Sequence, residues 1–296
     1  MTPPTFTMGP AILFCPADRP ERFAKAAERA DAVILDLEDA VAPDAKPAAR
    51  DHVRAADLDP ATTVVRVNDA ASPFFEDDLA AVRGTPFRTV MLAKAESAEQ
   101  VRRVTDALPD VQVIALCETA AGIVAASEIA AHSGVVALMW GAEDLVASLG
   151  GRSSRRPDGS YRDVAVAARA AVLLAAGAHG KAAIDAVHVD IADTEGLAAE
   201  AEDAAGSGFA ATACIHPGQV AVIREAYLPT AEDVDYARRL LAAAEGAPGV
   251  FRFEGHMIDG PLLRHAERTV AQARRADTLG TDELGTETPR TETREN

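Results

Sequence analysis

Eight short apolar runs, each of the length of a β-strand, recur along the chain from residue 11 to residue 215. They lie at residues 11–15, 32–37, 63–67, 90–92, 111–117, 135–140, 186–189 and 211–215. Segments with helical periodicity separate most of them, at residues 20–29, 47–56, 98–108, 122–132, 164–176 and 195–205, with a shorter helix at 74–83. Eight repeats of strand and helix predict a TIM-type (β/α)₈ barrel of the α/β class.

The composition favours one large domain rather than two small ones. Hydrophobic residues make up 48% of the chain but aromatic residues only 4%, which is typical of small aliphatic side chains packed between helices and a parallel sheet. No Ser/Gly-rich or charged linker divides the first part of the chain. We therefore expect residues 1–226 to form one catalytic barrel domain.

The chain continues beyond the expected barrel. A helical pattern at 231–244, an extended arm at 250–259 and a helix at 261–276 predict a C-terminal helical extension with a lid arm, over residues 227–277. Residues 278–296 contain almost no apolar side chains and are expected to form a disordered tail. Within the barrel, the polar segment 152–162 predicts a loop that covers the site.

Charge, hydropathy and cysteine content exclude several classes of protein. The net charge of −17 argues against a nucleic-acid partner and requires a local basic cluster for any anionic ligand. No apolar stretch approaches the length of a membrane span, and no Lys or Arg precedes the first apolar segment, so neither a membrane anchor nor a signal peptide is expected. Cys15, Cys117 and Cys214 lie in apolar runs, which predicts reduced core thiols and a cytoplasmic protein.

Two apolar runs lead to carboxylates, and these acids are the first candidates for a site. Glu118 directly follows the run at 111–117, and Asp144 closely follows the run at 135–140. Because barrel strands deliver their last residues to one face, we expect both acids there. Oxygen ligands suit Mg²⁺ or Mn²⁺ and leave positions free for a substrate carboxylate. The alternative is that each acid only caps the following helix.

Other charged residues also lie near the ends of the apolar runs. Arg66 interrupts a β-branched run and is expected to have a carboxylate partner, either a substrate or a structural ion pair. Asp36, Glu38 and Asp39 end the second run, where three neighbouring acids need a compensating cation or hydrogen-bond donors. A solvated helix start is the alternative for these three acids.

A basic cluster surrounds the first expected helix. Arg19, Arg22 and Lys25 lie around a helix start that contains Pro20. Positive side chains beside free backbone N–H groups predict a phosphate site, although exposed helix cations without a ligand are also common.

Seven motifs, in order and at the expected intervals, give the chain a family resemblance over about residues 13–276. It resembles the stand-alone citrate lyase beta-subunit-like proteins of the HpcH/HpaI aldolase superfamily, which includes malyl-CoA and citramalyl-CoA lyases. The motifs are Leu-Phe-Cys-Pro-Ala-Asp-Arg-Pro-Glu-Arg-Phe at 13–23, Ala-Val-Ile-Leu-Asp-Leu-Glu-Asp-Ala-Val at 32–41, Val-Arg-Val-Asn at 65–68, Cys-Glu-Thr-Ala at 117–120, Gly-Ala-Glu-Asp-Leu at 141–145, Cys-Ile-His-Pro-Gly-Gln at 214–219 and Met-Ile-Asp at 257–259.

The resemblance implies roles for the acids and for the arginine of the expected barrel. Glu118 and Asp144 match the family's two protein ligands for Mg²⁺, with Mn²⁺ as a substitute. Glu38 and Asp39 match the pair that lies beside the metal and holds its bound waters. Arg66 matches the residue that grips the α-keto acid opposite the metal.

The resemblance also implies a substrate that contains coenzyme A, and an oligomer. Arg19, Arg22 and Lys25 lie where the family faces coenzyme A. Asp259 matches an aspartate that reaches a neighbouring subunit's active site as an acid/base, which requires a homo-oligomer, a trimer or a hexamer. The alternative for Asp259 is an N-cap for the helix that begins near Pro261.

These roles together predict a Mg²⁺-dependent carbon–carbon lyase. It would cleave or form a 3-hydroxyacyl-CoA such as malyl-CoA or citramalyl-CoA, with acyl-CoA and glyoxylate or pyruvate as the other partners. One alternative keeps the same site but ends in thioester hydrolysis, as in a malate synthase or a malyl-CoA thioesterase. A second alternative is a citrate lyase beta subunit that acts on a citryl thioester within a complex.

Overall fold

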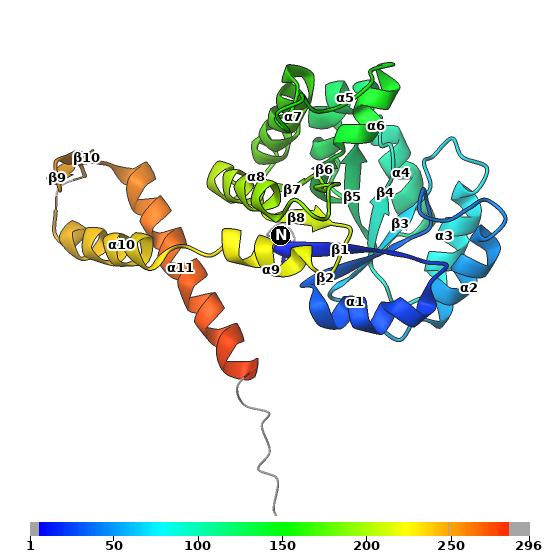
Figure 1. Cartoon of the computed structure of the whole chain (residues 1–296), viewed down its shortest axis with the longest axis horizontal. Coiled ribbons are helices and arrows are strands. Elements are labelled where there is room, and N and C mark those ends of the chain that lie inside the picture. Colours follow the sequence, from blue (N-terminus) through cyan, green and yellow to red (C-terminus); the bar gives the residue numbers. More distant parts are fainter. Residues whose placement is uncertain (1–5, 248, 284–296) are drawn as a thin grey trace, which may run out of the picture. The chain divides into compact units, whose positions relative to one another are not determined.

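The computed structural model describes residues 6–247 and 249–283, and its first part is a closed eight-stranded parallel barrel (Figure 1). Each strand pairs with the next one in the chain, and the eighth pairs with the first. The strands are β1 (Ala11–Pro16), β2 (Ala32–Asp36), β3 (Thr63–Val67), β4 (Thr89–Leu92), β5 (Gln112–Cys117), β6 (Val135–Trp140), β7 (Ala182–Asp185) and β8 (Ala211–Cys214). The predicted TIM-type barrel is confirmed.

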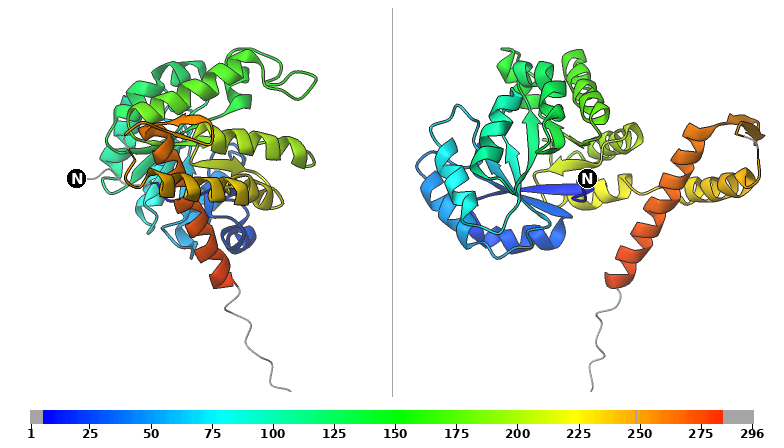
Figure 2. Two further views of the ribbon diagram at one scale, coloured as in Figure 1. Left: turned by 90° about the vertical axis from the view of Figure 1, so that its left-hand side faces the viewer. Right: turned by 180° about the vertical axis from the view of Figure 1, so that it is seen from behind.

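Helices surround the barrel on its outside (Figures 1 and 2). They are η1 (Pro20–Arg22), α1 (Phe23–Arg29), α2 (Lys46–Ala55), α3 (Phe75–Arg83), α4 (Ala98–Ala107), α5 (Ala120–Ala131), α6 (Ala142–Ser148), α7 (Asp163–Ala178), α8 (Thr194–Ser207) and α9 (Gln219–Ala226). The sequence did not predict α6, a short helix that directly follows β6. A seven-residue helix contains too few turns for its apolar side to repeat.

The strands have continuous apolar sequences because both of their faces are buried. All five residues of β2 and all six of β6 are buried. Ile12, Ile34, Val64, Met91 and Ile114, from five successive strands, belong to one buried cluster in which each is fully excluded from solvent. A parallel barrel covered by helices requires this pattern, since neither side of its sheet contacts water.

The seventh strand was placed four residues too late in the sequence. The prediction was 186–189, but β7 ends at Asp185. Asp185 is buried because Trp140 Nε1 donates to it at 2.5 Å and the Arg169 guanidinium donates to it at 2.8 Å. Asp185 interrupts the apolar pattern, so the sequence does not predict that it belongs to a strand. Only its contacts with Trp140 and Arg169 show how the strand can include this acid.

The second compact unit begins at Tyr227. It contains α10 (Ala231–Ala244), a two-stranded antiparallel hairpin of β9 (Phe251–Phe253) and β10 (His256–Ile258), and α11 (Gly260–Glu283). Leu240, Ile258 and Val270 join its separate buried core. The segment predicted as an extended arm is therefore the hairpin and its flanks. None of the described helices is long and apolar enough to cross a bilayer.

The tail prediction was wrong for residues 278–283. Helix α11 continues through them to Glu283, and residues 284–296 lie outside the described residues. Polar composition suggested disorder, but an existing helix can extend through polar residues because elongation does not require a new nucleus.

The three cysteines are free and buried, as the sequence predicts. Burial raises the pKa of Cys15 to about 11 and the pKa of Cys117 and Cys214 to about 12. Each thiol is therefore protonated at neutral pH and serves as a small core side chain.

A buried polar network supports the loop that follows β2. Lys46 Nζ donates to the carbonyl oxygens of Leu37 and Glu38, at 2.7 and 2.8 Å, and to Asn68 Oδ1 at 3.0 Å. Asn68 Nδ2 in turn donates to Asp78 Oδ2 at 2.6 Å, and Arg50 Nε donates to Asp78 Oδ1 at 2.7 Å. This network fixes the main chain that carries Asp36 and Glu38, because the Lys46 ammonium is buried and has three acceptors.

We predict that Asp78→Ala lowers the free energy of unfolding by about 3–5 kcal/mol, because it leaves the buried Arg50 charge without its main partner. Urea unfolding followed by the fluorescence of Trp140, the single tryptophan of the chain, measures this in the barrel unit. The matched control is Asp77→Ala. Asp77 is the neighbouring exposed acid, with only a 3.4 Å contact to Arg50, and should change stability by less than about 1 kcal/mol. Equal effects of the two substitutions would contradict the prediction.

Candidate active site

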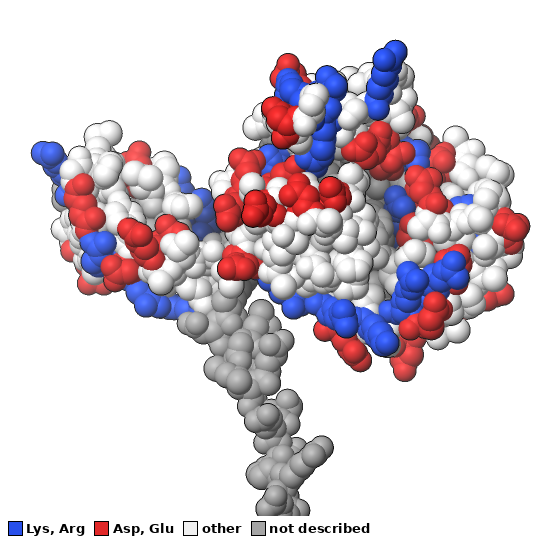
Figure 3. Space-filling model, in the orientation of Figure 1, with Lys and Arg blue, Asp and Glu red and all other residues white. Residues whose placement is uncertain are grey.

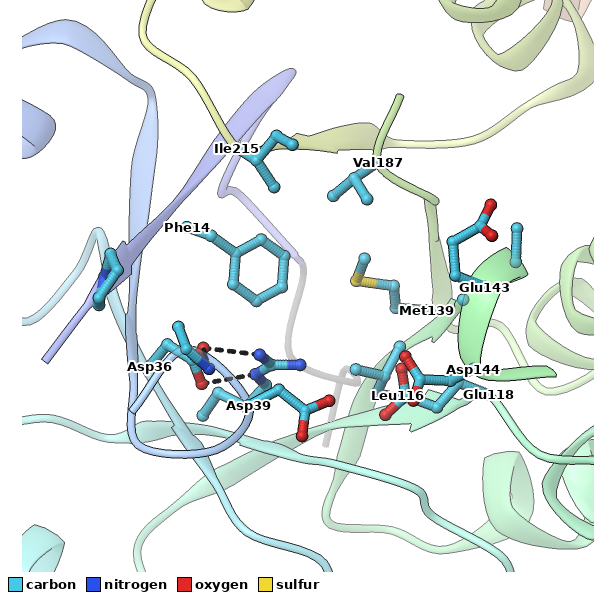
Figure 4. Close-up of a pocket in the computed structure, with 15 residues that line it drawn as sticks. Phe14, Asp36, Asp39, Leu116, Glu118, Met139, Glu143, Asp144, Val187 and Ile215 are labelled. Atoms are coloured by element: carbon cyan, nitrogen blue, oxygen red, sulfur yellow. Dashed lines mark hydrogen bonds and ion pairs between the residues drawn. The ribbon is translucent and has the colours of Figure 1, made fainter. Parts of the chain in front are cut away.

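A cavity of about 440 Å³ opens at the carboxyl ends of the barrel strands (Figure 4). Residues in or just after seven of the eight strands, all except β4, contribute to its wall. The lining residues are Phe14, Pro16, Asp36, Asp39, Ala40, Arg66, Leu116, Glu118, Met139, Gly141, Ala142, Glu143, Asp144, Val187 and Ile215. Asp36, Asp39, Glu118 and Asp144 lie along one side of the cavity in Figure 4, and Phe14, Met139, Val187 and Ile215 lie along the other, with Glu143 beside Met139.

Glu118 and Asp144 line the same side of the cavity, as expected (Figure 4). Glu118 directly follows β5 and is 3% exposed. Asp144 comes from the first turn of α6, so the expected placement of this acid at a strand end is wrong. A Cβ at Gly141 would lie only 2.8 Å from Glu118 Oε2, so the glycine between β6 and α6 provides the space for the buried carboxylate.

Lys94 links the two acids to each other. Its backbone N–H donates to Glu118 Oε1 at 3.1 Å, and its ammonium lies 3.6 Å from Asp144 Oδ1. The same ammonium donates to Glu38 Oε1 and lies 3.3 Å from Asp39 Oδ2. Lys94 has a φ of 47°, a left-handed conformation that is unusual for a residue other than glycine and that directs its N–H toward Glu118.

Arg66 forms a structural ion pair, which was one of the two alternatives predicted for it. Its Nε and Nη2 donate to the two oxygens of Asp36 at 2.7 and 2.6 Å, and its Nη1 lies 3.1 Å from Glu38 Oε2. The guanidinium also lies over the Phe14 ring, 4.9 Å from its centroid. Arg66 nevertheless lines the cavity, so the ion pair does not remove it from contact with a ligand.

Burial and the local charges determine the protonation of the site. Burial raises the pKa of Glu118 to about 8, and the nearby Asp144 adds to the shift while Arg66 opposes it. Burial also raises the pKa of Glu38, against the opposing effect of Arg66. Although burial disfavours a charged guanidinium, Asp36 and Glu38 outweigh it and raise the pKa of Arg66, which stays a cation.

Glu118 and Asp144 fit Mg²⁺ better than a metal ion that needs a closed set of protein ligands. Among the residues that the structure describes, no three His, Cys, Asp or Glu side chains form a group that could hold a metal ion. A closed protein site of the zinc kind is therefore absent from the described barrel. Glu118 and Asp144 next to an open cavity fit Mg²⁺ instead, because this ion takes one or two carboxylates and fills its other positions with water and substrate oxygens.

A second cavity, of about 460 Å³, shares Phe14, Pro16 and Ile215 with the first. Its wall includes Arg22 and Lys25, as predicted, and also Arg29, which the sequence did not identify. These cations lie in η1 and α1, and Figure 3 shows Lys and Arg side chains gathered along this edge of the barrel. The arrangement provides a basic compartment next to the acidic one.

Three predicted residues, Glu38, Arg19 and Asp259, line neither cavity. Glu38 is buried behind the wall, where it contacts Arg66 and Lys94. The half-exposed side chain of Arg19 lies 3.8 Å from Asp18. Asp259 belongs to the second compact unit, between β10 and α11. Its backbone carbonyl accepts the Leu263 N–H at 3.2 Å, and its side chain is half-buried.

Sequence reasoning missed Lys94 and Glu143. Lys94 closely follows an apolar run, which is the same signal that identified Glu118, but as a single cation it formed no recognisable pattern. Glu143 immediately precedes Asp144 and lines the cavity. Adjacent acids at a helix start cannot be separated by sequence alone, because both positions favour negative charge.

Comparisons with known proteins agree with this architecture. The family model described as HpcH/HpaI aldolase/citrate lyase matches residues 11–217. The structure is similar to that of protein CitE from Mycobacterium tuberculosis in complex with magnesium, acetoacetate and coenzyme A, with a TM-score of 0.86 and 57% sequence identity. That similarity covers 90% of this chain and 98% of the other.

Two curated relatives carry names of different activities. A (3S)-malyl-CoA thioesterase from Cereibacter sphaeroides is 36% identical over 272 residues, which cover 89% of this chain and 94% of the relative. The mitochondrial citramalyl-CoA lyase of Mus musculus is 33% identical over 294 residues, 89% of this chain and 85% of the relative. With the family model matching most of the barrel, the chain belongs to the HpcH/HpaI aldolase/citrate lyase family.

Proposed function

We propose that this protein is a Mg²⁺-dependent carbon–carbon lyase that acts on a 3-hydroxyacyl-CoA. The substrate is malyl-CoA, citramalyl-CoA or a close analogue, and the products are an acyl-CoA and glyoxylate or pyruvate. The observation that carries the proposal is the junction of two cavities, one acidic with Arg66 in its wall and one basic. The magnesium, acetoacetate and coenzyme A bound to the M. tuberculosis protein support the same division.

The basic cavity fits the coenzyme A part of the substrate. Arg22, Lys25 and Arg29 are cations that would bind phosphate groups, and Arg19 lies close to them in sequence. The thioester then reaches the acidic cavity past Phe14 and Ile215, which belong to both walls. This path brings the acyl end of the substrate to Arg66.

Glu118 and Asp144 would hold the Mg²⁺ ion, and Glu38 and Asp39 would orient its waters from the neighbouring loop. A bound Mg²⁺ would polarise the hydroxyl and carboxylate oxygens of the keto-acid half and stabilise negative charge there. Lys94 keeps these four acids together, since it contacts all of them.

Arg66 would grip the carboxylate of the keto-acid half and stabilise the negative charge on the substrate's hydroxyl oxygen. This oxygen releases its proton to solvent and becomes the keto-acid carbonyl as the carbon–carbon bond breaks, which leaves the acyl-CoA enolate. The Asp36 partner of Arg66 keeps the guanidinium charged and fixed, so little reorganisation is needed. Asp259, supplied by a neighbouring subunit, would then give a proton to the acyl-CoA enolate as it leaves. This role requires a homo-oligomer, a trimer or a hexamer, and the three buried thiols fit a reducing cytoplasm.

Two other reactions, hydrolysis of the thioester and cleavage of a citryl thioester, remain outcomes of the test. The relative named a malyl-CoA thioesterase favours hydrolysis after or instead of cleavage. Incubation with malyl-, citramalyl- and citryl-CoA in the presence of Mg²⁺, followed by chromatography of the products, separates the possibilities. Acetyl-CoA with a keto acid supports the lyase, free coenzyme A with the intact hydroxy acid supports hydrolysis, and no reaction with any of the three excludes the proposed function.

We predict that Glu118→Ala and Asp144→Ala abolish Mn²⁺ binding, measured by electron paramagnetic resonance, and also the lyase activity. Each substitution removes one of two protein ligands while the circular dichroism spectrum of the barrel is retained. The matched control is Glu128→Ala, an exposed acid of α5 outside the cavity. Full turnover of the wild-type protein in excess chelator would refute the metal requirement.

The pH dependence of Mn²⁺ affinity provides a further check. Because the pKa of Glu118 is raised to about 8, its carboxyl must lose a proton before it can bind the ion at lower pH. The affinity should therefore rise about tenfold per pH unit up to about pH 8 and then level off. A flat profile would show that Glu118 is not a ligand.

We predict that Arg66→Lys lowers kcat/KM by about 10- to 150-fold, the effect of losing a charge-assisted hydrogen bond of about 1.5–3 kcal/mol. An ammonium cannot contact Asp36 and a substrate carboxylate with the same fork. The control is Arg50→Lys, which alters an equally buried arginine away from the cavity and should affect stability but not kcat/KM. If both variants keep wild-type kinetics, Arg66 is only a structural ion pair.

We predict that Asp259→Asn binds both substrates but turns over at least about 10²-fold more slowly, the usual size of a lost general acid/base. Asp235→Asn, at an exposed position of α10, is the control. Mixed with inactive Arg66→Ala subunits, Asp259→Asn should regain part of the activity, because some sites then combine a native Arg66 with a neighbour's native Asp259. No recovery after verified subunit exchange would place Asp259 within its own subunit or limit it to the start of α11.

A further inference from the structure

A second cluster of charged side chains lies beside the active-site cavity and has no part in the proposed chemistry. His188, Glu200, Arg155 and Asp193 form it. His188 Nδ1 lies 2.8 Å from Glu200 Oε2, and His188 Nε2 lies 3.2 Å from Asp193 Oδ2, within ion-pair distance but outside hydrogen-bond geometry. Arg155 Nη2 donates to Glu200 Oε2 at 3.1 Å. The histidine is only 4% exposed, so its ring is fixed between two carboxylates.

The cluster is electrically balanced when His188 carries its proton. Arg155 and His188 then provide two positive charges, opposite Glu200 and Asp193. Tyr161, Glu143 and Asp185 are further titratable groups in this region, and the Tyr161 ring centroid lies 4.0 Å from the Arg155 guanidinium. The hydrogen bond with Glu200 raises the pKa of His188 above its ordinary value, while burial and Arg155 oppose the shift.

Hydrogen bonds connect this cluster to the cavity wall. The carbonyl oxygen of His188 accepts the Gln219 Nε2–H at 2.8 Å. Gln219 is 1% exposed, and its Oε1 accepts the backbone N–H groups of Ile215 and His216, both at 3.1 Å. Ile215 lines both cavities, and Val187, next to His188 in the chain, lines the acidic one on the same side as Met139 (Figure 4).

The cluster also holds the loop at residues 152–162. Arg155 Nη1 donates to the Gly159 carbonyl at 2.9 Å as well as to Glu200. Ser154, next to Arg155, is 1% exposed and donates its hydroxyl hydrogen to Glu143 in the cavity wall. Two separate segments of the wall therefore depend on Glu200 and its partners.

We propose that protonated His188 is a positioning residue that holds the wall between the two cavities, so that thioester binding weakens when His188 loses its proton. The loss leaves the partly buried Glu200 and the exposed Asp193 with one cation fewer and loosens the segment from Val187 to Asp193. Through Gln219 the change reaches Ile215, where the thioester would pass. The identity of the ligand rests on the proposed function, whereas the coupling of His188 to the wall does not.

The test compares the pH dependence of KM for the thioester substrate in three proteins over about pH 6 to 9. In the wild type, KM should be constant at low pH and rise about fivefold as pH passes the raised pKa of His188, which corresponds to losing one hydrogen bond of about 1 kcal/mol. In His188→Gln, which cannot titrate, this rise should disappear. The control is His179→Gln, a histidine at the end of α7 bonded to Ser127, which should keep the wild-type profile.

Glu200→Gln provides a separate check, because it removes the group that raises the pKa of His188. The pH at which KM rises should move downward in this variant, a shift that general destabilisation of the barrel would not produce. Identical profiles for the wild type, His188→Gln and Glu200→Gln would overturn the proposal.

Hydrogen exchange decides the proposal even if no thioester is a substrate. The amides of Ile215 and His216 donate to Gln219, so their exchange, corrected for its intrinsic pH dependence, should become faster above the pKa of His188. His188→Gln should remove this change. Protection that stays constant with pH would refute the coupling, whereas absence of turnover with intact pH-dependent protection would refute only the proposed lyase function.

Discussion

Five carboxylates meet at one end of the barrel, and two cations keep them together. Asp36, Glu38, Asp39, Glu118 and Asp144 come from β2 and its loop, from the end of β5 and from α6. Arg66 pairs with Asp36 and Glu38, and Lys94 contacts the other three as well as Glu38. Without these partners, buried like charges would repel one another at a cost of several kcal/mol.

The same balance would let the site hold the proposed metal ion without being closed around it. The five acids outnumber the two cations, Arg66 and Lys94. Of these five acids, only Glu118 and Asp144 line the cavity without a cationic group within 3.5 Å of their carboxylate oxygens. An ion bound there keeps open positions for oxygens of the substrate. The buried Lys46 and Asn68 donate hydrogen bonds to the main-chain carbonyl oxygens of Leu37 and Glu38 and so fix the loop that carries the acids.

The two cavities share a wall but differ in charge, and this difference would orient a substrate that has one anionic end. Arg22, Lys25 and Arg29 give one cavity positive charge, and the other, lined by carboxylates, is where the proposed metal ion and keto acid would bind. The His188 cluster controls the wall between them through main-chain hydrogen bonds rather than through contact with the ligand. Binding of the anionic end and chemistry at the proposed metal ion can therefore be altered separately.

The sequence by itself determined the barrel, and it identified the acids Glu118 and Asp144 and the cations Arg22 and Lys25 that line the two cavities. Apolar runs buried on both faces, alternating with helical patterns, leave few other folds, and seven of the eight strands lie where the pattern predicts. It misplaced β7, because Asp185 ends the apolar run although Trp140 and Arg169 bury it within the strand. It also missed Lys94, whose partners Glu38 and Asp39 lie 56 and 55 residues away along the chain. Only the tertiary structure decided that Arg66 pairs with Asp36, that Asp144 comes from a helix rather than a strand, and that His188 connects to the cavity wall. Those outcomes depend on contacts between distant segments, which no local pattern of hydrophobicity or charge records.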